Sequence, residues 1–150
     1  MPYITTTDLS ARLGATLYAR LTDRVNGTTA DTSVAQQIVD EAQAEADSYL
    51  AGRYATPIDL TAHPELADLL TARVLDLAEF GAWKSSPFVS DPPHRVHVLH
   101  DTAARWFADV ASGGIVLPAT APPRASIARD DAPCYSERTR PFTANELDGL

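Results

Sequence analysis

The sequence predicts an all-α protein, a small helical bundle of three long helices plus short N-terminal helices, with an extended C-terminal arm. Apolar residues recur at helical spacing in three long stretches separated by proline-containing breakers, and no stretch alternates clearly enough to demand a sheet. After Leu117 this periodicity disappears, and five of the eleven prolines lie in residues 118–150. We therefore predict a bundle domain over residues 1–117 and an arm over residues 118–150.

The length and composition are those of one folded domain. The chain has 150 residues, of which 45% are hydrophobic and 21% are charged, and this is ordinary for a protein with a real core. The net charge of −8 opposes nucleic-acid binding, because such binding rests mainly on cationic contacts to phosphate. The single cysteine, Cys134, excludes an internal disulfide and a cysteine-built zinc site. With a single cysteine, we expect folding inside the cell, and we recognise no signal peptide and no run of membrane-spanning length.

Two short helices are expected at the N-terminus. Thr5 and Asp8 have the spacing of a capping box, with aspartate in place of the usual glutamate, and Gly14 is a natural stop. A second segment, ATLYARL, follows and leads into the polar loop DRVNGTTAD. Leucines at helical spacing are expected to pack both segments on the core: Leu9, Leu13, Leu17 and Leu21.

Three long helices are expected after this loop. Asp31 can cap the first, which we expect to run to about Tyr54, where TPIDLTAHP breaks the chain with two prolines. The second is expected at 64–84, with Pro64 in its first turn, and the third at 93–112, ended by SGG. The third helix carries a heptad-like seam suited to packing against another helix. The seam is formed by Val96, Leu99, Ala103, Trp106 and Val110.

The C-terminal arm is expected to need a partner. Residues 118–140 are rich in proline and lack apolar periodicity, so we expect them to be extended in the isolated subunit. Thr143 can cap one short helical turn, which by itself is too short to be stable in water. We expect this end of the chain to order by docking, with three residues burying apolar area and two arginines meeting acidic groups. These docking residues are Phe142, Leu147, Leu150, Arg138 and Arg140.

The stretch DSYLAGRYATPI, residues 47–58, supports two interpretations. In one it is a helix end, with Tyr49 and Leu50 buried. In the other, Arg53 and Tyr54 project from the helix terminus to bind a neighbouring subunit, since both residue types combine contact area with hydrogen bonding. The same residues can serve both purposes, so both interpretations stay open.

We find no catalytic signature and expect no enzyme activity, no cofactor and no metal. There is no arrangement of a nucleophile with its base and no glycine-rich phosphate loop. His94, His97 and His100 lie three residues apart beside Asp101, but this spacing drifts around a helix and completes no ligand set, which favours a solvated face. A solvated face is also expected for the carboxylates of the first long helix: Asp40, Glu41, Glu45 and Asp47.

Two further motifs at the N-terminal end are weak evidence for calcium binding and for DNA binding. The loop DRVNGTTAD has neither the oxygen ligands nor the glycine of a calcium loop at the required offsets. The stretch TTTDLSARLGATLYARLTDR has the rhythm of a helix-turn-helix, but its second segment offers only Arg20 and Arg24 in an acidic protein.

Four stretches, taken in their order along the chain, resemble a family of tailed-phage and prophage proteins. They are YITTTDLSARLG, LTDR before a polar loop, AEADSYLAGRYATPI and RPFTANELDGL. The family is that of the Mu-like head-to-tail adaptor, or connector, proteins, and the likeness covers about 1–115 and 138–150. Its most specific parts are SYLAGRY and the F-T-x-x-x-L-x-G-L ending. The loop at 84–93 and the arm at 118–137 look longer than a minimal member would need.

The resemblance implies a structural virion protein of the neck, between capsid and tail. It implies an adaptor that forms a ring, often a dodecamer, beneath the portal protein and joins it to a neck or tail-completion protein. A ring needs a heterologous interface, and an acidic protein would let the genome DNA pass without specific binding. The alternatives are a tail-completion or head-closure protein one layer further down, and a small acidic DNA-linked regulator that uses the N-terminal helix-turn-helix-like segment.

Overall fold

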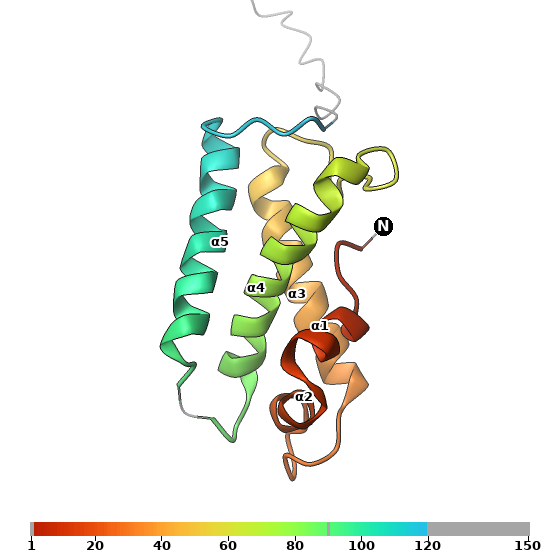
Figure 1. The fold of residues 1–150 in the computed structure, drawn as a ribbon, viewed down its shortest axis with the longest axis vertical. Helices are drawn as coiled ribbons and strands as arrows, with labels where there is room; N and C mark the ends of the chain where they lie inside the picture. Colours follow the sequence, from red (N-terminus) through yellow and green to blue (C-terminus); the bar gives the residue numbers. More distant parts are fainter. Residues whose placement is uncertain (1, 90, 120–150) are drawn as a thin grey trace, which may run out of the picture.

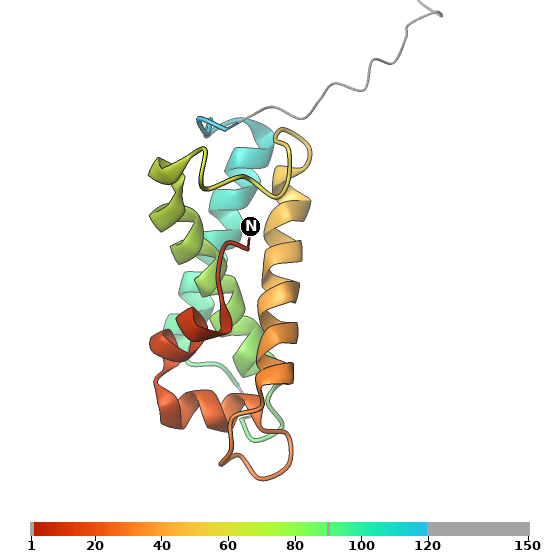
Figure 2. The same cartoon turned by 90° about the vertical axis from the view of Figure 1, so that its right-hand side faces the viewer.

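The computed structural model describes residues 2–89 and 91–119, and within these ranges the chain is helical and has no strand. Three helices of 19 residues each, α3 (Thr32–Leu50), α4 (Ala67–Ser85) and α5 (His94–Ser112), run along the long axis of the bundle (Figure 1). The short helices α1 (Thr6–Leu13) and α2 (Ala15–Thr22) lie at one end, and α2 crosses the direction of the long helices (Figure 2). The predicted all-α bundle is therefore confirmed. The division from the arm at residue 117 stays a prediction.

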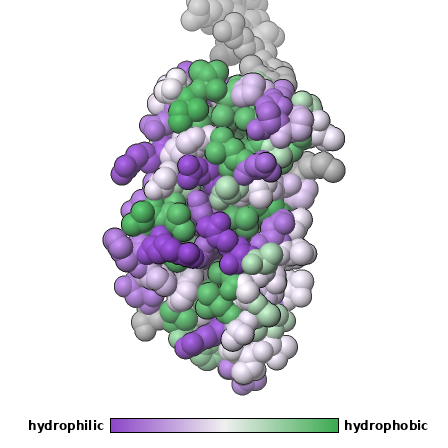
Figure 3. Space-filling model, in the orientation of Figure 1, coloured by the Kyte–Doolittle hydropathy of each residue, from purple (hydrophilic) through white to green (hydrophobic). Residues whose placement is uncertain are grey.

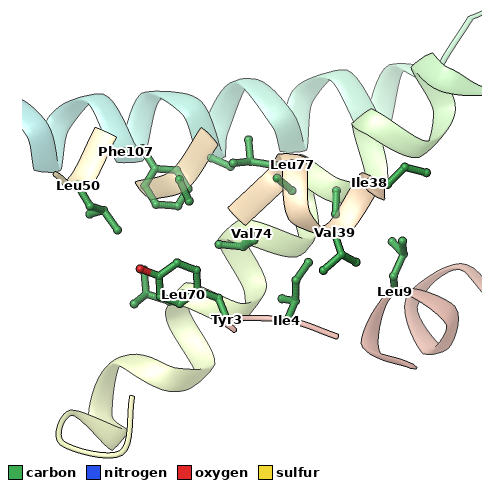
Figure 4. Close-up of a cluster of buried hydrophobic side chains, with 14 of the residues drawn as sticks. Tyr3, Ile4, Leu9, Ile38, Val39, Leu50, Leu70, Val74, Leu77 and Phe107 are labelled. Atoms are coloured by element: carbon green, nitrogen blue, oxygen red, sulfur yellow. The ribbon is translucent and has the colours of Figure 1, made fainter. Parts of the chain in front are cut away.

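Helix α4 lies at the centre and contacts every other helix of the described chain. Its buried apolar residues face more than one neighbour, because α3 packs on one side of it and α5 on another. Figure 4 shows the resulting core, in which side chains from the N-terminal segment, α1, α3, α4 and α5 point toward one another. The fully buried members include Ile4, Leu9, Val39, Val74 and Phe107.

Four of the predicted helix boundaries are confirmed by their cap geometry. The backbone N–H of Asp8 donates to Thr5 Oγ1 over 3.3 Å, and the N–H of Thr5 donates back to the Asp8 carboxylate over 2.8 Å. Asp31 accepts the N–H groups of the first turn of α3 in the same manner. Gly14 separates α1 from α2 at φ 78°, and Gly113 ends α5 in the left-handed conformation at φ 89°, which favours glycine.

Two boundaries differ from the prediction. Helix α3 ends at Leu50 rather than near Tyr54, because the chain tightens into a turn in which the N–H groups of Arg53 and Tyr54 both donate to the Leu50 carbonyl. The next helix opens with one 3₁₀ turn, η1 (Pro64–Leu66), before α4 begins. Helix ends commonly adopt such tighter turns, and apolar periodicity does not distinguish them from an α-helix.

The buried face of α5 is wider than the predicted seam. Val96, Ala103 and Val110 are buried as expected, whereas Leu99 and Trp106 are only half-buried. The seam omitted Phe107, which is fully buried and is the largest completely buried side chain of the described residues. A heptad seam describes contact with one helix, but α5 packs against both α3 and α4 and so buries a broader stripe.

Candidate interaction surfaces

Two tyrosine hydroxyls hold three chain segments together at the upper end of the bundle in Figure 1. The Tyr3 hydroxyl donates to Asp47 Oδ1 over 2.6 Å and accepts the Ile58 N–H over 2.8 Å. The Tyr54 hydroxyl accepts the Leu117 N–H, also over 2.8 Å. Burial, and secondarily the hydrogen bond to Asp47, raise the pKa of Tyr3 well above its usual range. These hydrogen bonds hold the segments at this end of the bundle together, and the chain continues from this end beyond residue 119.

Tyr54 lies inside the subunit and does not project from the helix end. Its side chain is only 5% exposed, and its hydroxyl is occupied by the Leu117 N–H. Of the two interpretations of DSYLAGRYATPI, the helix end is correct for Leu50, which is fully buried. The turn after Leu50 carries the Tyr54 ring into the core, so this ring is not available to a neighbouring subunit.

Tyr54→Phe is expected to lower the free energy of unfolding by about 1–2 kcal/mol, because it leaves the buried Leu117 N–H without its acceptor. In this variant, hydrogen exchange at the Leu117 amide should also be faster than in the unchanged protein. Tyr49→Phe is the matched control, since the Tyr49 hydroxyl makes no hydrogen bond within the described residues and should matter little. Equal stability of the Tyr54→Phe variant and the unchanged protein would contradict this role.

Arg53 remains exposed, and it covers the C-terminal end of α5. The Arg53 guanidinium lies over Gly113, where a Cβ atom would push this flexible side chain aside, and the positive φ of Gly113 is what favours glycine there. A cation at this place also suits the carbonyl end of a helix. Arg53 therefore lies at the surface beside the C-terminal end of α5. That Arg53 contacts a neighbouring subunit stays a prediction.

The other predicted partner-binding residues are Arg138, Arg140, Phe142, Leu147 and Leu150, and all five lie outside the described residues.

The described surface has a hollow between α3, α4 and α5, which we call the α3–α4 groove. Its volume is about 310 Å³, and buried apolar side chains form its floor. Exposed Glu41 and Glu45 of α3 form one wall, and Lys84 and His100 line it from α4 and α5. The full lining is Ile38, Glu41, Ala42, Glu45, Leu77, Phe80, Gly81, Lys84 and His100. A groove with an apolar floor and an acidic wall suits a peptide that carries both an aromatic side chain and cations.

The remaining exposed apolar residues are scattered. On the face in Figure 3, hydrophobic residues show through in several separate patches between hydrophilic ones. The large exposed apolar side chains of the described residues come from five different segments: Val25, Leu69, Phe88, Val98 and Val116. Single exposed residues of this kind are normal and do not by themselves indicate a binding site.

Two of the three histidines of α5 contact the aromatic ring of Phe80 on α4, and His94 is exposed. His100 stacks on Phe80 with ring centroids 4.1 Å apart, and His97 meets the same ring edge-on at 5.3 Å. The expectation of a solvated face is thus wrong for His100, whose side chain is 22% exposed because α4 places an aromatic ring against it, whereas the His97 side chain remains 43% exposed. No group of three metal-ligating side chains occurs within residues 2–89 and 91–119.

A buried ion-pair cluster, which the sequence analysis missed, joins α1 and α5 to α4. Asp76 and Glu79 of α4 are only 5% and 3% exposed. Arg12 bridges them, with Nη2 2.7 Å from Asp76 Oδ1 and Nε 3.1 Å from Glu79 Oε2. Arg95 lies 3.2 Å from Glu79, and Arg73 lies 3.8 Å from Asp76. The sequence signal was the pair of carboxylates inside the apolar run VLDLAEF.

The two carboxylates in this cluster are held by arginines. Burial raises the pKa of Asp76, and Arg12 followed by Arg73 opposes that effect. Because both carboxylates form ion pairs with guanidinium groups, the cluster fits a structural role in which it holds α1 and α5 against α4.

Asp23 organises the loop between α2 and α3. Its carboxylate is nearly buried and accepts four backbone N–H groups, from Val25, Asn26, Thr28 and Thr29, over 2.8–3.1 Å. These N–H donors hold the pKa of Asp23 well below its usual range. Its oxygens therefore close the loop internally, which explains the acidic residue in DRVNGTTAD without a cation.

Asp23→Asn is expected to destabilise the protein at pH 7, because an amide cannot accept all four N–H groups. The carboxylate contribution is present above the unfolded pKa near 3.8 and is lost as the pH falls below it toward the lower folded value. In urea unfolding, the gap between the unchanged protein and the variant should therefore close as the pH is lowered from about 4. Asp40→Asn, at an exposed position on α3, is the control. A stability difference between the unchanged protein and Asp23→Asn that does not depend on pH would contradict the role of the Asp23 carboxylate in closing the loop.

No helix among the described residues is both long enough and apolar enough to span a bilayer.

Comparison with known proteins places the chain in a family. A search among curated proteins finds no match. The family model described as "Bacteriophage Mu, Gp36" matches residues 3–132, which include every helix of the described structure. The match begins at Tyr3, the first residue of the buried core, and ends before residues 138–150. Because it covers most of the sequence, this chain belongs to the bacteriophage Mu Gp36 family and is a Mu-like phage protein.

Proposed function

We propose that this phage protein is a head-to-tail adaptor, a structural component of the virion neck that forms a ring beneath the portal protein. The observation that carries the proposal is the family match over residues 3–132, since membership points to a phage structural or assembly protein. The resemblance of the N-terminal and C-terminal motifs to connector proteins supports the more specific role. The proposal assigns the chain no enzyme activity, cofactor or metal.

The ring would use different surfaces on neighbouring copies, as closed rings with heterologous contacts require. One half is the upper end of the bundle, where Arg53 is exposed and Leu117 is anchored. The other half is the arm, residues 118–150, which continues from that same end. The acidic charge of −8 would let DNA pass through the ring without adhering.

Assembly would proceed by ordering of the arm. Phe142, Leu147 and Leu150 would bury apolar area in a groove of the portal or of an adjacent adaptor, at about 1.5–3 kcal/mol for each side chain fully buried. Ordering the arm offsets much of this gain in one subunit. Repetition around a ring makes the total large, so the contact would be weak in isolation and strong in the assembled neck.

The test is to mix the full chain with portal particles and measure particle mass by light scattering, with a tail-attachment assay beside it. We expect the mass to rise by a ring of adaptor copies and tails to attach. The variant truncated before residue 138 should bind less and attach fewer tails. Failure of the full chain to bind portal would contradict the adaptor role, and unchanged binding by the truncated chain would contradict the role of the arm.

A further inference from the structure

The α3–α4 groove has a charge pattern that specifies what can occupy it. Helix α3 carries four carboxylates and no lysine, arginine or histidine over Thr32–Leu50. Glu41 accepts a hydrogen bond from the Gln37 amide, whereas the Glu45 carboxylate has no partner among the described residues. The opposite side of the groove includes Lys84, whose ammonium group likewise forms no ion pair within the described chain. An occupant should therefore offer cations to α3 and an apolar group to the floor.

We propose that this groove binds residues 138–142 of a second copy of the chain. That segment reads RTRPF, so Arg138 and Arg140 match the acidic wall formed by Glu41 and Glu45, and Phe142 supplies an aromatic side chain for the apolar floor. Glu137, which precedes it, matches the unpaired Lys84. The inference rests on the proposed function, because a ring requires one patch on each copy to meet a different patch on the next.

The length of the intervening chain permits this contact. The last described residue is Ala119, and the chain to Arg138 adds 19 residues, which span at most about 65 Å when extended. Each long helix of the bundle is about 28 Å long, at about 1.5 Å per residue. The segment can therefore leave the end fixed by Tyr54 and Leu117 and reach a neighbouring bundle.

The decisive experiment is a mixed disulfide between two differently tagged chains. Cys134, the only natural cysteine, is first replaced in both chains by Cys134→Ser. One chain then carries Lys84→Cys at the groove and the other carries Thr143→Cys beside Phe142, which leaves the acidic wall and both arginines intact. The mixture is oxidised alone and on portal particles. We expect a disulfide between the two tags, and a yield at least about tenfold lower when Ala11→Cys, exposed on α1, replaces Lys84→Cys.

A charge exchange tests the recognition itself. Adding Glu41→Arg and Glu45→Arg to the groove chain should lower the disulfide yield at least about tenfold, because like charges then face each other. Adding Arg138→Glu and Arg140→Glu to the other chain should restore it. Both glutamates are exposed, and the helical circular dichroism of each variant verifies that the bundle is intact.

The outcomes separate this inference from the adaptor role. Absence of the mixed disulfide, an equal yield when Ala11→Cys replaces Lys84→Cys, or a failed charge rescue would overturn the inference. A mixed disulfide with charge rescue, combined with no binding of the full chain to portal, would support the groove contact and contradict the adaptor role. Portal binding without the mixed disulfide would support the adaptor role and contradict the groove contact.

Discussion

Arg12→Ala is expected to lower the free energy of unfolding by about 3 kcal/mol, because it leaves two buried carboxylates without their shared cation. Loss of one partner of a buried ion pair costs about 3–5 kcal/mol. We expect the lower end of that range, since the Arg12 side chain is 31% exposed and both Arg73 and Arg95 remain near the carboxylates. Urea unfolding at pH 7 measures the change.

The pH dependence of this variant distinguishes the ion pair from simple packing. Burial raises the pKa of Asp76 even with Arg12 present, so removal of Arg12 should raise it further. A carboxyl group with a raised folded pKa costs stability when it is ionised, and protonation relieves that cost as the pH falls through the folded pKa. The gap between the variant and the unchanged protein should therefore narrow on acidification. Arg24→Ala, an exposed arginine that forms no ion pair within the described residues, should change little at any pH.

Two outcomes would contradict this structural role of the ion-pair cluster. One is an Arg12→Ala variant as stable as Arg24→Ala at pH 7. The other is a stability gap that stays constant on acidification, which would indicate lost packing alone. Arg12→Lys, which keeps the charge but not the two-pronged geometry, should fall between the unchanged protein and Arg12→Ala.

Phe107→Ala is expected to lower the free energy of unfolding by about 3–5 kcal/mol, the range for truncation of a fully buried phenylalanine to alanine. The ring stacks on Tyr49 of α3 with centroids 6.0 Å apart and meets Trp106 edge-on at 5.0 Å. Its removal would open a cavity between α3 and α5 that the surrounding backbone can fill only in part. Thermal and urea unfolding both report the loss.

The control for Phe107→Ala lies on the same helix. Val98 is 48% exposed, so Val98→Ala should change stability by no more than about 0.5 kcal/mol. Phe107→Leu, which keeps most of the buried area, should be milder than the alanine variant. If Phe107→Ala and Val98→Ala proved equally stable, the assignment of Phe107 to the centre of the core would be wrong.

Local interactions account for what the sequence predicted well. The capping box of Thr5 and Asp8, the cap at Asp31 and the stop at Gly113 all depend on residues within a few positions of one another. Such contacts are readable because helix caps and glycine turns have short, fixed spacings. Apolar periodicity then sufficed for the all-α class and the three long helices.

Long-range packing accounts for what the sequence did not reveal. The hydroxyl of Tyr54 meets Leu117, 63 residues away, and Arg12 meets Asp76 and Glu79, 64 and 67 residues away. A seam read from one helix also missed Phe107, since its burial depends on two neighbours. No spacing rule within a single helix contains these partners.

The sequence by itself determined which segments become helices, where α1 and α3 begin, and that residues 138–142 combine cations with an aromatic side chain. The tertiary structure alone decided that Tyr54 belongs to the core, that Arg53 stays at the surface, and that Glu41 and Glu45 border an apolar groove. The physical reason is that capping and periodicity act over one or two turns, whereas burial and charge pairing depend on which helix faces are brought together. Only the packed bundle puts an acidic wall beside an apolar floor, and this combination is the basis for the proposed binding of residues 138–142.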